Sequence, residues 1–81
     1  MKIEEILKKH IGAKCHFLSA GKSCEIFLGM HGQVSNCTIE DVTDEFIILK
    51  LTNIPGNNYS VYLLANVALH FYDMKPYLKE C

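Results

Sequence analysis

The sequence predicts a mainly β (α+β) domain, in which an N-terminal helix precedes a five-stranded, strongly bent small barrel. Three observations support this prediction. Apolar residues recur at helical spacing over residues 3–11, apolar and polar residues alternate after Gly12, and turn-forming residues separate the alternating stretches. The 81 residues are enough for one domain, which divides into a helix (1–12), a barrel (13–73) and a tail (74–81).

The first element is a helix. Ile3, Ile6, Leu7 and Ile11 fall on one helical face, and Gly12 follows as a stop signal. Acidic residues in the first turn and basic residues in the last turn complement the helix dipole.

The next elements are extended. Cys15 and Phe17 alternate with polar residues, which predicts a strand with one buried face. Residues 24–30 (CEIFLGM) either begin a long second strand or form a separate insertion. From Gly32 an extended stretch reaches Val42, and its alternation slips twice, which indicates a bent and bulged strand.

The second half of the chain contains a corner and three further strands. Residues 43–45 form the corner, and the apolar run 46–49 opens a strand that we expect to be covered on both faces, because a strongly curved sheet folds back on itself. The remaining elements follow in order: a third strand at 46–52, a turn at 53–58, a fourth strand at 59–64, a one-turn link at 65–67 and a fifth strand at 68–72.

Composition restricts the partners. The formal net charge is −1, and all eight basic residues are lysines, so arginine, the preferred donor to phosphate and base edges, is absent. The chain starts MKIEEILKKHIG, without the features of a signal peptide, and has no apolar stretch approaching the ~18 residues of a membrane span. We therefore expect a cytoplasmic protein that does not contact membranes, with its four cysteines as reduced thiols.

Two segments resemble the Sm/Hfq (LSm) family of small barrels, which are SH3-like in architecture. GQVSNCTIEDVTDEFIILKLTN (32–53) is similar to the Hfq segment in which a glycine-led bent strand meets an Asp-x-Phe corner and an apolar strand. VYLLANVALHF (61–71) is similar to strand 4, the one-turn link and strand 5 of that family. With the helix, the resemblance covers about three-quarters of the chain.

The family's nucleic-acid motifs are not matched. Hfq-type proteins carry a Tyr-Lys-His run on strand 4 that lines a uridine site; here Tyr62 matches the tyrosine, while Leu63 and Leu64 occupy the lysine and histidine positions. The Arg-Gly pair of eukaryotic-type Sm proteins is also missing. The resemblance therefore implies the fold without carrying over uridine binding.

Self-association is the leading functional hypothesis. In Sm-like rings strand 4 of one subunit pairs with strand 5 of the next, which removes open sheet edges. By this resemblance Tyr62, Leu63, Leu64 and Phe71 form a subunit interface, and the chain is a non-enzymatic interaction or scaffold module whose partner is a further copy, in a homo-oligomer or ring.

RNA binding is the alternative. Lys8, Lys9, Lys14 and Lys22 supply positive charge, and Tyr62 supplies a ring on which a base can stack. Composition does not favour this alternative, since the lysines are balanced by acids.

A third reading is a small-ligand pocket between subunits, lined by Asn57, Asn58 and Asn66. We expect no catalytic residues, metal or cofactor. The cysteines and histidines lack the spacing of metal ligands, and Cys24, although it lies near Lys22 in the sequence, has no paired histidine and acid that would make it a nucleophile.

Overall fold

The N-terminal helix is shorter than the sequence predicts. The computed structural model describes residues 2–29 and 35–71, and in it α1 spans Ile3–Lys8. Ile6 and Leu7 are buried, whereas Ile11 is exposed. The backbone tightens after Lys8 into successive turns and reverses at Gly12, which has a φ of +90° that favours glycine. The predicted helix end at Gly12 is therefore wrong: the helix ends at Lys8, and turns replace its last expected residues up to Gly12.

The described residues form one six-stranded mixed sheet in the order β5-β4-β3-β1-β2-β6. The mainly β class is confirmed, and in this part of the chain the strand count is six rather than five. The elements after α1 are β1 (Lys14–Ala20), β2 (Ser23–Leu28), β3 (Cys37–Val42), β4 (Phe46–Leu51), β5 (Tyr59–Leu63), the 3-10 turn η1 (Leu64–Asn66) and β6 (Val67–Phe71).

The additional strand is β2, in the segment whose role the sequence left open. Cys24, Ile26 and Leu28 are all buried, as expected for a strand with one face on the core. β2 pairs with β1 as an antiparallel hairpin and with β6 as a parallel neighbour. A separate strand therefore lies between β1 and β6.

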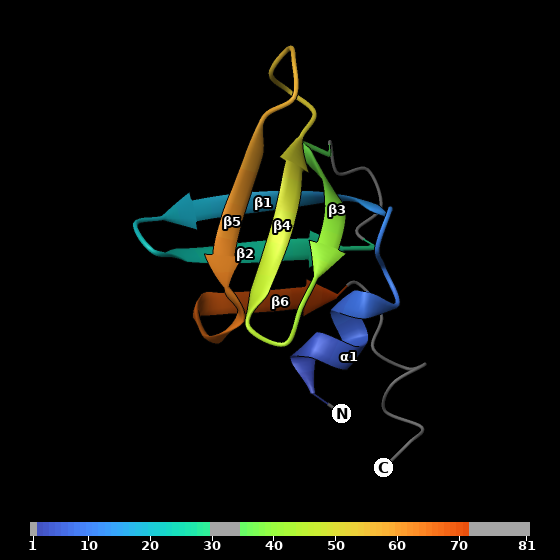
Figure 1. Cartoon of the computed structure of the whole chain (residues 1–81), viewed down its shortest axis with the longest axis vertical. Coiled ribbons are helices and arrows are strands. Elements are labelled where there is room, and N and C mark those ends of the chain that lie inside the picture. Colours follow the sequence, from blue (N-terminus) through green and yellow to red (C-terminus); the bar gives the residue numbers. More distant parts are fainter. Residues whose placement is uncertain (1, 30–34, 72–81) are drawn as a thin grey trace.

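The sheet folds over itself where β1 meets β3. These strands align at two positions in the described chain, Lys14 with Thr38 and Cys15 with Cys37. Figure 1 shows the consequence: β3, β4 and β5 run across β1, β2 and β6. The two halves of the sheet enclose the core between them, and Leu7 of α1 joins it.

β3 contains the irregularity expected near its end. Its register with β4 shifts between Ile39 and Asp41, which confirms the second slip in alternation. The first slip involves Val34, which lies outside the described residues. Thr43 builds the following corner, because its Oγ1 accepts hydrogen bonds from the N–H groups of Phe46 (3.0 Å) and Glu45 (3.3 Å).

β4 is covered on one face, so the expectation that both its faces are buried was wrong. Ile47 and Leu49 are fully buried, Ile48 is half-buried, and Phe46 is exposed. The sheet folds back over the inner face of β4 while the outer face stays at the surface. The predicted turn and one-turn link are both present, the link beginning one residue earlier than expected, at Leu64.

Candidate functional site

β5 presents its more apolar side to solvent. Tyr59, Val61 and Leu63 are 49%, 56% and 46% exposed, whereas the intervening Ser60 and Tyr62 are half-buried on the core side. Strands that cover a core ordinarily alternate in the opposite sense, with apolar residues inside and polar residues outside. The pattern of β5 is therefore typical of a strand whose outer side contacts another surface.

β4 extends this apolar surface. Phe46 stands opposite Leu63 in the β4–β5 ladder, and Ile48 stands opposite Val61. Together with Tyr59, which lies opposite Lys50, these residues define what we call the β4–β5 outer face. Its five members are Phe46, Ile48, Tyr59, Val61 and Leu63.

The four residues predicted for a subunit interface occupy different environments. Leu63 is exposed on the β4–β5 outer face, whereas Leu64 is buried in the core and its N–H donates to the Glu45 carbonyl (2.8 Å). Tyr62 is half-buried, with its ring edge-on to Phe17 at a centroid distance of 6.3 Å. Phe71 packs against the core at the end of β6. Of the four, Leu63 is the one placed to meet a partner without rearrangement.

The strand order adds a second feature that suits self-association. Among the strands that the structure describes, β5 and β6 stand at the two ends of the sheet. An end strand carries a row of backbone groups that its own sheet does not bond, which is a template for pairing with a further strand. The exposed side chains and the open backbone edge of β5 therefore belong to the same strand.

The lysines proposed for nucleic-acid binding do not form one patch. Lys8 and Lys9 lie at the end of α1, and Lys14 begins β1, whereas Lys22 lies beyond the far end of β1, about 23 Å along a seven-residue strand. The Lys8 Nζ is also paired with Glu4 Oε2 at 2.7 Å, and this pairing raises the pKa of Lys8.

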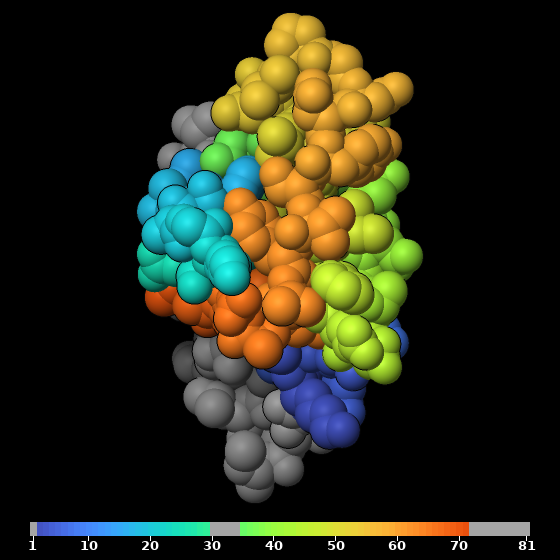
Figure 2. All heavy atoms as spheres, turned by 60° about the vertical axis from the view of Figure 1, so that its left-hand side comes forward, coloured from blue at the N-terminus to red at the C-terminus, as the bar shows by residue number. Residues whose placement is uncertain are grey.

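Lys22 instead lies beside a hollow that Tyr62 also lines. A hollow of about 240 Å³ lies between the β1–β2 turn and β5, and Lys22, Tyr62 and Asn66 contribute to its lining together with Gly21, Val61 and Leu63. In Figure 2 the cyan hairpin lies beside the orange β5 strand at this place. A cation, a phenol and a carboxamide thus lie around one small hollow.

The three asparagines that were predicted to line a small-ligand pocket are separated in the structure. Asn57 and Asn58 precede β5, and Asn66 follows it in η1. The side chain of Asn58 is engaged in its own turn, where Nδ2 donates to the Pro55 carbonyl (2.8 Å). Within one copy of the chain these side chains therefore do not line a shared pocket.

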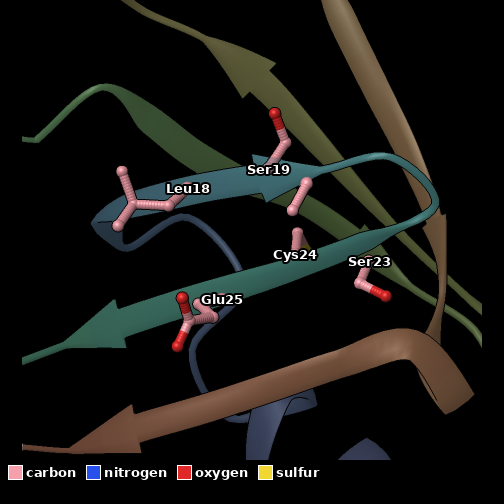
Figure 3. A pocket seen from close by; sticks show the side chains of 6 residues that line it. Leu18, Ser19, Ser23, Cys24 and Glu25 are labelled. Carbon is pink, nitrogen blue, oxygen red and sulfur yellow. The ribbon is translucent and has the colours of Figure 1, made fainter.

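A second hollow, of about 270 Å³, lies on the β1–β2 hairpin (Figure 3). Its lining is Leu18, Ser19, Ala20, Ser23, Cys24 and Glu25. Cys24 is 2% exposed, and burial raises the pKa of its thiol to about 11, so the sulfur stays protonated at neutral pH. Cys24 is therefore a buried, protonated thiol of β2.

Aromatic and imidazole rings form a row across the outer face of β1, β2 and β6. His16 pairs in register with Phe27, and Phe27 with His70. The Phe27 and His70 rings stack at 4.5 Å with an interplanar angle of 11°, and His70 Nε2 lies 3.1 Å from Glu25 Oε1. Phe27 therefore lies on the side of β2 opposite the buried Ile26 and Leu28, and its ring is stabilised by this row.

Several features of these surfaces were not predicted from the sequence. Tyr59, Val61 and Phe46 were not singled out as exposed, although the alternation of residues 59–63 contains the signal: placing Ser60 and Tyr62 inward forces the apolar residues outward. Within residues 2–29 and 35–71, no group of three or more His, Cys, Asp or Glu side chains is arranged to hold a metal ion. The same residues contain no helix of the length and hydrophobicity needed to cross a membrane.

Comparisons with protein-family models, with curated proteins and with solved structures gave no match to this chain.

Proposed function

We propose that the chain is a non-enzymatic, self-associating interaction module of Sm-like type, which assembles with further copies through β5. The observation that carries the proposal is the inverted alternation of β5, with Tyr59, Val61 and Leu63 outside and Ser60 inside. Burying apolar area stabilises an assembly by about 25 cal/mol per Å², so a contiguous apolar face favours association.

A further copy of the chain is the occupant that fits this strand best. β5 and β6 end the same sheet on opposite sides, so β5 of one copy and β6 of the next can continue the sheet from copy to copy. Repetition of one head-to-tail contact closes into a ring when the rotation permits. The resemblance of residues 61–71 to strands 4 and 5 of Sm-like proteins supports the same arrangement.

Light scattering coupled to size exclusion over a dilution series tests the proposal. The mass should exceed that of the 9.2 kDa chain at micromolar concentrations and fall on dilution. A monomer that persists at several hundred micromolar would contradict self-association.

The second candidate function is binding of single-stranded RNA, and the observation that favours it is the hollow shared by Lys22, Tyr62 and Asn66. Lys22 would attract phosphate, and the amide of Asn66 offers hydrogen bonds to a base edge.

Titration of labelled uridine-rich, adenine-rich and mixed RNA at low salt tests this candidate function. Binding should weaken as salt rises and should be lost in Lys22→Ala. Lys9→Ala is the matched control, because Lys9 lies away from the hollow. Absence of a shift with all three RNAs excludes this function.

A further inference from the structure

Two core cysteines face each other across the fold of the sheet. Cys15 of β1 and Cys37 of β3 are partners in the antiparallel register, and their Sγ atoms are 3.0 Å apart. Both side chains are buried, at 3% and 0% exposure. All three cysteines in the described part of the chain are free thiols. The third, Cys24 of β2, is not a register partner of the other two, because it stands opposite Ser19 in β1 and Val67 in β6.

The backbone already has a spacing that a disulfide bond accepts. Antiparallel register partners have Cα atoms about 4.5 or 5.5 Å apart, and disulfides span Cα distances of about 4.4–6.8 Å. The sulfur atoms need to approach by about 1 Å to reach the bonding distance of about 2.05 Å. A bond between them therefore requires small side-chain rotations and leaves the strands in place.

The surroundings hold this pair in position. On one side Lys14 pairs in register with Thr38. On the other side the Asn36 side chain pairs with the backbone of Phe17: its Oδ1 accepts from the Phe17 N–H (2.9 Å) and its Nδ2 donates to the Phe17 carbonyl (2.9 Å). The asparagine thus continues the ladder beyond Cys15 and Cys37.

The two thiols also differ in the direction in which their pKa values are shifted. The hydrogen bond between the sulfurs lowers the pKa of Cys15, and the same bond together with burial raises the pKa of Cys37. The Cys37 Sγ also lies 3.5 Å from the Cys15 carbonyl oxygen, a second acceptor for its proton. Cys15 is therefore the sulfur of the pair that loses its proton more readily.

We propose that Cys15 and Cys37 form a two-electron redox site that hydrogen peroxide oxidises to a disulfide, joining β1 covalently to β3. The Cys15 thiolate attacks one peroxide oxygen, the O–O bond breaks, and the leaving hydroxide takes up a proton to become water. Cys15 is then a sulfenic acid. The Cys37 sulfur attacks the Cys15 sulfur, the S–S bond forms as the S–O bond breaks, and the departing hydroxide takes the Cys37 proton as a second water.

The choice of oxidant follows from burial. Neither sulfur is accessible to a bulky disulfide reagent in the closed fold, whereas hydrogen peroxide needs little more room than water. The product bond would lie at the place where β1 and β3 align at just two described positions, so it would fasten the two halves of the sheet together. The proposal concerns the core and is independent of whether the chain self-associates.

Peptide mapping of the peroxide-treated full chain tests the proposal. The protein is treated with hydrogen peroxide, its remaining thiols are alkylated under denaturing conditions, and it is digested without reduction. The expected result is a cross-linked peptide pair containing Cys15 and Cys37, a loss of two hydrogens in the intact mass, and reversal by a dithiol reductant. The oxidised form should melt about 10 °C or more above the reduced form.

Two variants sharpen the test. Cys37→Ser should stop at the sulfenic acid, which dimedone then traps on Cys15 once the peroxide-treated chain is denatured in the presence of this reagent. Cys24→Ala is the matched control, since it removes a buried thiol outside the pair, and it should still form the Cys15–Cys37 bond. The proposal is overturned if peroxide leaves Cys15 and Cys37 alkylatable in the wild-type chain, or if the bond that forms involves Cys24 or Cys81 instead.

Discussion

Phe46 and Leu63 stand directly opposite each other in the β4–β5 ladder, and both side chains point away from the core. Cross-strand pairs of large apolar residues stabilise sheets most when they are buried. Here the pair remains 39% and 46% exposed, next to a second apolar pair formed by Ile48 and Val61.

Leu63→Lys should weaken assembly while leaving the fold intact, because it places a charge in the apolar contact without disturbing the core. We expect the dissociation constant of the assembly to rise at least about tenfold, equivalent to about 1.4 kcal/mol. Light scattering measures the mass over a dilution series, and circular dichroism checks the fold. Leu18→Lys is the matched control, because Leu18 is 51% exposed on a different face and should leave the mass unchanged. Equal masses for both variants and the parent would argue against an interface at β5.

Leu64→Ala should destabilise the monomer, although the residue is the immediate neighbour of Leu63. Leu64 is 7% exposed and belongs to the core cluster, so truncation leaves a cavity and should cost about 2–5 kcal/mol. Leu63→Ala should cost less than about 1 kcal/mol in the dissociated chain. Urea unfolding at low protein concentration compares the two, and equal losses of stability would contradict their assignment to opposite faces.

Asn36→Asp tests the side chain that continues the β1–β3 ladder. The aspartate loses the N–H that bonds the Phe17 carbonyl and brings a carboxylate against that oxygen, so unfolding free energy should fall by about 1–3 kcal/mol at neutral pH. The deficit should shrink below about pH 4, where the protonated acid again provides a donor.

Asn58→Asp is the control for this substitution. Its Nδ2 also donates to a backbone carbonyl, that of Pro55, but at an exposed turn, and the change should cost less than about 0.5 kcal/mol. Urea denaturation measures the loss of unfolding free energy in both variants. Similar losses would show that the Asn36 side chain does not stabilise the contact between β1 and β3.

The Cys24 thiol should make stability depend on alkaline pH. Its pKa is raised from 9.0 to about 11 in the folded chain, so the unfolded chain ionises first. Stability from this group is complete below pH 9 and is lost as the pH rises toward 11. Urea titrations between pH 8 and pH 11 should show a smaller decline for Cys24→Ala than for the parent, whatever the absolute stability of the variant. Parallel declines would show that the thiol titrates normally.

Local elements were predictable because their determinants are close together in the sequence. The helix from Ile3, the corner built by Thr43 and the one-turn link before β6 each depend on neighbouring residues. The inner side of β4 was not predicted in this way, because residues 46–49 are all apolar and their pattern does not show that Ile47 and Leu49 are the buried ones.

The rest depends on contacts between distant segments. No local pattern specifies that β2 lies between β1 and β6, because the β2–β6 ladder joins residues from opposite parts of the chain. The pairing of Cys15 with Cys37 requires the register of β1 against β3. The hollow that Lys22 and Tyr62 both line requires the β1–β2 hairpin to lie beside β5. Alternation predicts that Leu63 and Leu64 face opposite ways, but it does not say which of them is inside.

The parallel ladder between β2 and β6 also sets the order in which the molecule can be completed. During synthesis the β1–β2 hairpin emerges early, but the strand that pairs with the other side of β2 begins at Val67. A nascent chain that stops before Val67 carries a finished hairpin with an uncovered edge, the kind of edge through which incomplete chains aggregate. Closure of the fold therefore awaits the last strand, and the closing step is a long-range encounter of the kind that slows folding.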